Sequence, residues 1–339
     1  MPRYHFEDFE PGSTMAYGAV EVTADDIVAF ARDFDPQVFH LDAAAARETF
    51  AGELIGSGWH TCALLMRMIA DGFILDSASQ GAPGIEEVKW MRPLRPGDRV
   101  SARHTVLEAR ASKSRPDLGL VRFRFEIVNA AGEPLATQTN WIMIGRRGMD
   151  GVPAAPLART PATGEGAEPA APAGDPPEHP FPFFESVAVG TVNELGSHRF
   201  GADEIVRFAR AFDPQRFHVD AEAARGSLFG ALCASGWHTG ALWMRHMVEH
   251  RRAAAEAARA RGLQPASLGP SPGFRDLKWL KPVYVDDVIT YRSTVTDKRA
   301  SASRPDWGLV FNENTGHNQH GELVFAFQGC VFWEREPRS

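Results

Sequence analysis

The chain has 339 residues, of which 44% are hydrophobic and 23% charged, a composition typical of a globular protein with room for two domains. Its formal charge of −7 disfavours nucleic acid and anionic membranes as partners. Three cysteines without metal-ligand spacing, and an N-terminus without the apolar run of a signal peptide, lead us to expect a cytoplasmic protein with reduced thiols and no bound metal.

Hydrophobic periodicity and turn signals divide the first half into elements. A capping-box pattern, Thr23 with Asp26 three residues later, predicts the start of a helix, and the Asp35-Pro36 step predicts its end. In chain order we expect a strand at about 13–22, a helix from Thr23 to Asp35, an Ala-rich helix at 42–47, a long apolar helix from about Ser57, a strand around "KWMRPLRPGD" at 89–98, and alternating strands at 99–110, 120–129 and 136–145.

The second half repeats this pattern. Residues 30–67 and 208–245 are identical at 25 of 38 positions with a constant offset of 178. Further on, "SRPD" recurs at an offset of 189, so the second copy has gained 11 residues inside 246–273. Within this range, residues 246–262 are basic and Ala-rich, and we interpret them as a solvated helical extension rather than a nucleic-acid arm. A period this long indicates two fused domains rather than a solenoid.

A segment between the copies separates them. Residues 147–180 are rich in Pro, Ala and Gly and nearly free of large apolar side chains, so they cannot bury enough surface to offset their ordering entropy. We therefore expect an N-terminal domain at 1–146, a linker at 147–180 and a C-terminal domain at 181–339.

The repeated words "FDPQVFH", "SGWHT" and "KWMRPLRPGD" resemble those of the MaoC-like dehydratases, the (R)-specific enoyl-CoA hydratase family of hot-dog folds. The family motif is Asp-x-Asn-Pro-x-His. Here Gln replaces Asn in both copies, and Val or Arg replaces Pro. The resemblance implies an α+β fold in which two hot-dog domains form a double hot-dog, each antiparallel sheet wrapping a long central helix. Such a chain is a covalent pseudo-dimer, and further association into homo-oligomers is left open.

The resemblance also implies the catalytic groups. A carboxylate beside an imidazole can orient one water and move protons near neutral pH, which assigns catalysis to Asp35 with His40 and to Asp213 with His218. Because both halves keep the pair, we expect two sites. The alternative is that Asp-Pro only ends a helix and that the histidine is structural.

Other groups are expected to hold the thioester. Gly58 and Gly236, where the long helices begin, are candidate oxyanion-hole donors, or are needed there only for packing. Arg115 and Arg304, in loops beside serines, are candidates for the phosphates of coenzyme A, or pair with the aspartates two residues later.

Four other residues are assigned less specifically. Lys89 and Lys278 could join the same basic rim or be solvated strand residues. His60 and His238 could serve as second bases, but their apolar surroundings favour a role in the core or at the interface.

The sequence thus predicts a hydro-lyase that hydrates 2-enoyl-CoA or dehydrates 3-hydroxyacyl-CoA. Coenzyme A would be part of the substrate, with no separate cofactor and no nucleic-acid or membrane partner, since no Gly-x-Gly-x-x-Gly follows a strand and no long apolar run occurs. The alternatives are a hot-dog thioesterase and a non-catalytic acyl-CoA-binding protein.

Overall fold

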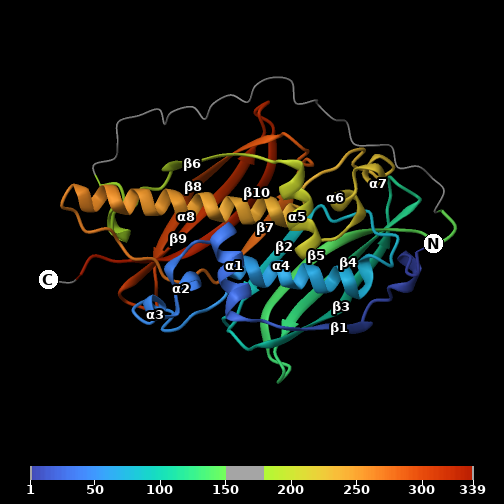
Figure 1. Ribbon diagram of the computed structural model, residues 1–339, viewed down its shortest axis with the longest axis horizontal. Helices are drawn as coiled ribbons and strands as arrows, with labels where there is room; N and C mark the ends of the chain where they lie inside the picture. Colours follow the sequence, from blue (N-terminus) through green and yellow to red (C-terminus); the bar gives the residue numbers. More distant parts are fainter. Residues whose placement is uncertain (1, 150–178, 338–339) are drawn as a thin grey trace.

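The computed structural model describes residues 2–149 and 179–337, so most of the expected linker at 147–180 lies outside the described residues. The described strands form one ten-stranded antiparallel sheet in the order β1-β3-β4-β5-β2-β7-β10-β9-β8-β6 (Figure 1). Their bounds are β1 Thr14–Glu21, β2 Gly84–Trp90, β3 Arg99–Ala111, β4 Leu118–Val128, β5 Pro134–Gly145, β6 Val192–Arg199, β7 Gly273–Trp279, β8 Val288–Ala300, β9 Trp307–His317 and β10 Leu323–Glu334.

The helices occur in the same order in each half. They are α1 Ala24–Phe34, α2 Val38–Leu41, α3 Ala43–Ala46 and α4 Gly58–Ile69 in the first half, and α5 Ala202–Phe212, α6 Arg216–Val219, α7 Ala221–Arg225 and α8 Gly236–Ala260 in the second. Short 3-10 turns lie at Phe6–Asp8 and Phe184–Ser186, and a π-helical turn, η2, at Ala70–Ile74 follows α4. In the described part of the chain, no helix is long and apolar enough to cross a membrane.

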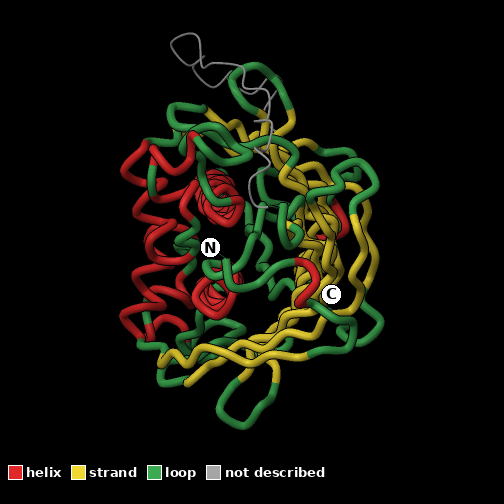
Figure 2. The backbone as a smooth tube through the Cα atoms, turned by 90° about the vertical axis from the view of Figure 1, so that its right-hand side faces the viewer, coloured by secondary structure: helices red, strands yellow, loops and turns green. Residues whose placement is uncertain are grey.

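The two halves join through β2 and β7, which pair antiparallel with Ile85 opposite Leu277. Glycine is required on both strands, because a Cβ at Gly84 or Gly273 would lie 2.1 or 2.0 Å from a carbonyl oxygen of the facing strand. The expected pair of sheets is therefore one continuous sheet, which curves around the long helices α4 and α8 (Figure 2). The α+β double hot-dog is confirmed.

Each long helix also fixes the end of the other half's first helix. Arg67 of α4 donates to the carbonyl of Arg210 at 2.7 Å, and Arg245 of α8 donates to the carbonyl of Asp33 at 3.0 Å. The largest hydrophobic core of the described residues contains buried side chains from both halves, including Trp59 and Phe274, whose rings stack with centroids 5.1 Å apart. The segment that carries each acid is therefore positioned partly by the opposite half.

Most of the predicted elements are confirmed, and the capping box is present: the Asp26 carboxylate accepts from the Thr23 N–H at 2.9 Å, and the Thr23 hydroxyl oxygen accepts from the Asp26 N–H at 3.1 Å. The strand predicted across 89–98 is wrong for most of its length, since β2 ends at Trp90. Pro93 and Pro96 lack an N–H for the ladder, so the chain turns there instead. The extra residues of the second copy extend α8 to 25 residues, whereas α4 has 12.

Candidate active site

Asp35 is the residue that caps the C-terminus of α1, and it is only 2% exposed. Its Oδ2 accepts a hydrogen bond of 2.6 Å from the Ser57 hydroxyl, and its Oδ1 accepts one of 2.8 Å from the Gln37 amide. Two donors to a buried carboxylate fix its orientation. The Gln that departs from the family motif therefore directly supports the acid.

His40 lies on the short helix α2 beside this carboxylate. Its Nδ1–H donates to the carbonyl of Ile55 at 2.7 Å, which leaves Nε2 without the proton in the neutral ring. That Nε2 lies 3.4 Å from Oδ2 of Asp35. An imidazole nitrogen and a carboxylate oxygen thus face the same small volume, as a pair that orients and deprotonates one water requires.

The start of α4 is built next to this pair. Ser57 is the N-cap, and its Oγ accepts from the Trp59 N–H at 3.1 Å while donating to Asp35. The N–H of Gly58, the first residue of the helix, has no intrahelical acceptor, as in the first turn of any helix. A Cβ at Gly58 would lie 2.5 Å from the Trp90 indole, so the packing role of this glycine is established as well.

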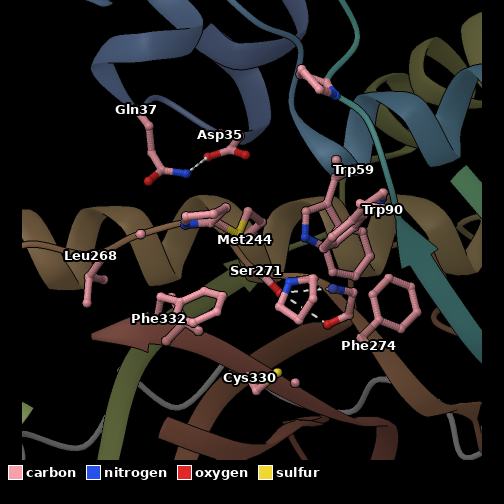
Figure 3. A pocket seen from close by; sticks show the side chains of 18 of the residues that line it. Asp35, Gln37, Trp59, Trp90, Met244, Leu268, Ser271, Phe274, Cys330 and Phe332 are labelled. Carbon is pink, nitrogen blue, oxygen red and sulfur yellow. Dashed lines mark hydrogen bonds between the residues drawn. The ribbon is translucent and has the colours of Figure 1, made fainter. Parts of the chain in front are cut away.

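A cavity of about 650 Å3 lies in front of these groups, a volume that suits a small-molecule ligand. Asp35, His40 and Gly58 line it from the first half, and the opposite wall comes from α8, the 268–274 segment, β9 and β10 of the second half. In Figure 3, Asp35 and Gln37 lie on one side, Phe332 and Cys330 on the other, and Trp59, Trp90 and Phe274 at one end. The cavity is thus shared between the halves.

The second half repeats the geometry of the pair. Asp213 accepts 2.6 Å from Ser235 and 2.9 Å from Gln215, and His218 donates to the Cys233 carbonyl at 2.8 Å. The distance between His218 Nε2 and Asp213 Oδ2 is 3.5 Å. Burial lowers the pKa of His218, an effect that the Asp213 carboxylate opposes. The repeated sequence motif therefore predicted both pairs, and in the structure each aspartate lies next to its histidine.

Comparison with known proteins identifies the family. The model of the MaoC-like domain matches residues 8–121 and 185–306, which is well over half of the chain. The chain belongs to the MaoC-like domain family. The family name and the arrangement of the elements agree with the resemblance seen in the sequence motifs.

Individual relatives agree with this assignment. The uncharacterized protein YdeM of Bacillus subtilis is 28% identical over 152 residues, which are 45% of this chain and 99% of YdeM. A putative MaoC domain protein dehydratase from Chloroflexus aurantiacus superposes with a TM-score of 0.74 over 99% of both chains at 17% identity. A conserved hypothetical protein from Mycobacterium tuberculosis, described as a double hotdog fold, gives 0.68 over 97% of this chain and 98% of its own at 16% identity. The last two show the fold alone.

The two pairs of this MaoC-like protein differ in their surroundings. A second cavity of about 780 Å3 is lined by Gln215 and Phe217, which are close in sequence to the second pair. Neither this cavity nor the first one is lined by Asp213, His218 or Gly236. Phe229 lies beside that pair, with its ring 4.6 Å from Phe217 and 6.4 Å from His218. The position 178 residues earlier is Ala51, but its neighbour Phe50 packs on Phe39 at 4.9 Å and lines the first cavity, so an aromatic ring flanks both pairs.

The walls that face the two pairs differ as well. The first cavity is lined by Arg251, Asn312 and Asn314 of the second half. At the same offsets, the first half has Phe73, Phe123 and Phe125, all almost completely buried and in mutual ring contact. The strand registers support the equivalence of the two asparagines with Phe123 and Phe125, since Phe123 pairs with Val106 and Asn312 with Val295, themselves 189 residues apart.

The four predicted phosphate-binding residues lie in different environments. Arg115 donates twice to Asp117, at 2.9 and 2.6 Å, so the alternative of a structural pair holds for it. Arg304 makes no ion pair within the described residues; it packs over the Phe332 ring at 4.9 Å and lines the first cavity. Lys89 pairs with Glu87 on the exposed face of β2, and Lys278 is exposed on β7; neither lines either cavity.

The histidines of the two "SGWHT" words are core residues, as predicted. His60 stacks on Phe30 at 4.6 Å, and His238 stacks on Phe208 at 4.5 Å. Burial lowers their pKa values to about 4 and about 3, so both are neutral at physiological pH. Neither lines the first cavity.

Several residues of the site were not predicted. Ser57 and Ser235 are in the repeated word, and their position just before a helix is a signal for capping that sequence reasoning could have used. The sequence indicates only that Arg251 belongs to a solvated extension, and that Asn314 lies in the counterpart of the strand at 120–129. Nothing local in the sequence indicates that these two face the acid of the other half.

Proposed function

We propose that this protein adds water reversibly to 2-enoyl-CoA thioesters, and that the reaction takes place at Asp35 and His40. The observation that carries this proposal is the convergence of the His40 Nε2, the Asp35 carboxylate and the helix N–H of Gly58 on one cavity. The membership of the MaoC-like family supports the same reaction class.

The reaction needs one water held between Asp35 Oδ2 and His40 Nε2. As the water oxygen forms its bond to the β-carbon, one of its protons passes to the pair, and the electrons of the double bond move toward the thioester oxygen. The N–H of Gly58, with the favourable dipole of α4 behind it, stabilises the enolate oxygen. A proton from the pair then reaches the α-carbon, so that the net change is one water added across the double bond.

Coenzyme A is expected to enter past Arg304. This guanidinium has no carboxylate partner in the described residues and lies at the wall contributed by the second half. Arginine binds phosphate through paired N–H donors, which suits the pyrophosphate and the 3′-phosphate. Arg115, its equivalent, is already engaged by Asp117.

The second pair is proposed not to turn over substrates of this kind. Asp213 and His218 line neither of the two cavities described above, and the positions that Asn312 and Asn314 hold on the wall of the first cavity are held in the first half by Phe123 and Phe125, which are buried and in ring contact. The preserved contacts of Asp213 with Ser235 and Gln215 then serve the fold of the second half.

The matched pair Asp35→Asn and Asp213→Asn tests this assignment, because each change removes the same charge from the same hydrogen bonds. With crotonyl-CoA, loss of enoyl absorbance should fall by more than 100-fold in Asp35→Asn and by less than twofold in Asp213→Asn. Equal loss in both variants, or activity that survives in Asp35→Asn, would contradict the assignment to the first pair.

Free thiol is followed in the same reaction. Thiol release at the rate of enoyl loss would identify a thioesterase instead. Binding of the thioester without either signal in the wild type would identify an acyl-CoA-binding protein.

A further inference from the structure

One face of α8 forms a wall of the first cavity, and the last residue of this face that lines the cavity is an arginine. Trp243, Met247 and Arg251, spaced four residues apart, all line it. At 1.5 Å per residue they extend over about 12 Å of wall, with the apolar residues first and the guanidinium last. An arginine on the inner face of a cavity next to two large apolar side chains is unusual enough to need a chemical reason.

The charge of Arg251 is not paired within the part of the chain that the structure describes. Within the described residues no carboxylate lies at ion-pair distance from it and no hydrogen-bond acceptor is engaged by it, whereas the next arginine along this helix toward its start, Arg245, pairs with Glu249. Burial lowers the pKa of Arg251 to about 10, and the Asp35 carboxylate, which is near enough to interact electrostatically, raises it. The guanidinium is therefore charged at neutral pH and partly buried, with the Asp35 carboxylate in electrostatic range but with no anion bonded to it among the described residues, a state that an anionic ligand would stabilise.

The sheet contributes polar groups to the same wall. Asn314 is only 2% exposed, and its Oδ1 accepts 2.8 Å from the Ser293 hydroxyl. This bond orients the amide and leaves the Nδ2 hydrogens without an acceptor among the described residues. Gly329 leaves room beside them, since a Cβ there would lie 3.4 Å from Nδ2. A fixed, unpaired N–H donor thus lines the cavity together with a cation.

The first half shows what this wall looks like without such a function. Its equivalents of Arg251, Asn312 and Asn314 are three phenylalanines, packed at centroid distances of 5.2 to 6.4 Å. A purely apolar acyl chain would be served by such residues. The second half instead has a cation and two amides at these positions, which favours a ligand that is anionic there.

We infer that the acyl group accepted at Asp35 and His40 carries a carboxylate, which Arg251 and the Asn314 amide bind. The inference rests on the proposed hydration and names its substrate class: thioesters of unsaturated dicarboxylic acids. The phosphates of coenzyme A are a less suitable occupant, because the pantetheine arm separates them from the thioester, whereas Arg251 lies within electrostatic range of the acid at the reacting end. Arg304 remains available for the phosphates.

Binding tests the inference without turnover. Glutaryl-CoA and pentanoyl-CoA have five acyl carbons each, cannot be hydrated, and differ by one carboxylate. By calorimetry, the wild type should bind glutaryl-CoA at least 10-fold more tightly than pentanoyl-CoA. Arg251→Gln should weaken the binding of glutaryl-CoA by about 10- to 100-fold, the usual range for a hydrogen bond to a charged group, and should change the affinity for pentanoyl-CoA by less than twofold. Arg252→Gln, on the exposed side of α8, should change neither.

Turnover adds a second readout with glutaconyl-CoA and 2-pentenoyl-CoA, where Arg251→Gln should lower kcat/KM only for the former. Equal binding of both saturated esters to the wild type, or an equal loss of both in Arg251→Gln, would overturn the inference. Hydration of 2-pentenoyl-CoA with no preference for glutaconyl-CoA would overturn it while leaving the proposed function intact. If the wild type hydrates neither thioester, the proposed function fails, and the calorimetric preference alone decides whether Arg251 binds a carboxylate.

Discussion

Ser57 and Ser235 offer a test that separates stability from catalysis. Each hydroxyl is completely buried, donates 2.6 Å to the adjacent aspartate, and caps a long helix by accepting from a tryptophan N–H at 3.1 or 3.2 Å. Loss of a hydrogen bond to a charged group costs about 1.5–3 kcal/mol, and loss of an N-cap about 0.5–2 kcal/mol. Replacement by alanine should therefore destabilise the fold by roughly 2–5 kcal/mol, and by a similar amount in Ser57→Ala and Ser235→Ala.

The two variants should differ in activity, although they resemble each other in stability. Ser57→Ala frees the carboxylate that faces the open cavity and should lower kcat for crotonyl-CoA by about 10- to 100-fold, whereas Ser235→Ala should leave it within twofold. Stability is measured by urea unfolding followed through tryptophan fluorescence, and activity at a temperature where both variants are folded. Equal losses of kcat would refute the reasoning about unequal pairs. An unchanged unfolding midpoint in either variant would refute the energetic role assigned to the hydroxyl.

Two further predictions concern charge. Arg304→Gln should raise KM for crotonyl-CoA about 10-fold with little change in kcat. Arg115→Gln should leave KM unchanged, because Asp117 already binds that guanidinium. Both variants are measured by steady-state kinetics, and equal KM values would contradict the role of Arg304. The folded state lowers the pKa of His60 from 6.5 to about 4, so its contribution to stability is complete above about pH 6.5 and is lost as the pH falls toward 4. Between pH 7.5 and pH 5, the free energy of unfolding should therefore fall by about 2 kcal/mol less in His60→Phe than in the wild type, as measured by urea unfolding. The same pH dependence in both proteins would contradict the burial of a neutral His60 ring.

The parts of the fold that sequence predicted are those set by local chemistry. The Thr23–Asp26 box and the Asp35-Pro36 step define α1 because caps and proline act on their immediate neighbours. The two acid–imidazole pairs could be found because their spacing of five residues is repeated. The end of β2 at Trp90 was missed, although Pro93 and Pro96 carried the signal.

The difference between the two sites could not be predicted from local sequence. The words around Asp35 and Asp213 are nearly identical, and so is their geometry. What distinguishes them, Arg251 and Asn314 against Phe73 and Phe125, lies in the opposite half of the chain and faces each pair only through the tertiary arrangement. Period-two alternation predicts that a strand residue points inward, but not which cavity it meets.

The joining of β2 to β7 places the water-activating groups and most of the opposing wall on separate copies of a duplicated sequence. Substitutions within one repeat can then reshape what the protein accepts while the hydrogen bonds around its acid stay untouched in the other. A single-repeat ancestor that assembles as a symmetric dimer lacks that freedom, because each substitution in a cavity wall would be present in both subunits and would alter both active sites. Duplication followed by fusion thus uncouples selectivity from chemistry at the level of the gene.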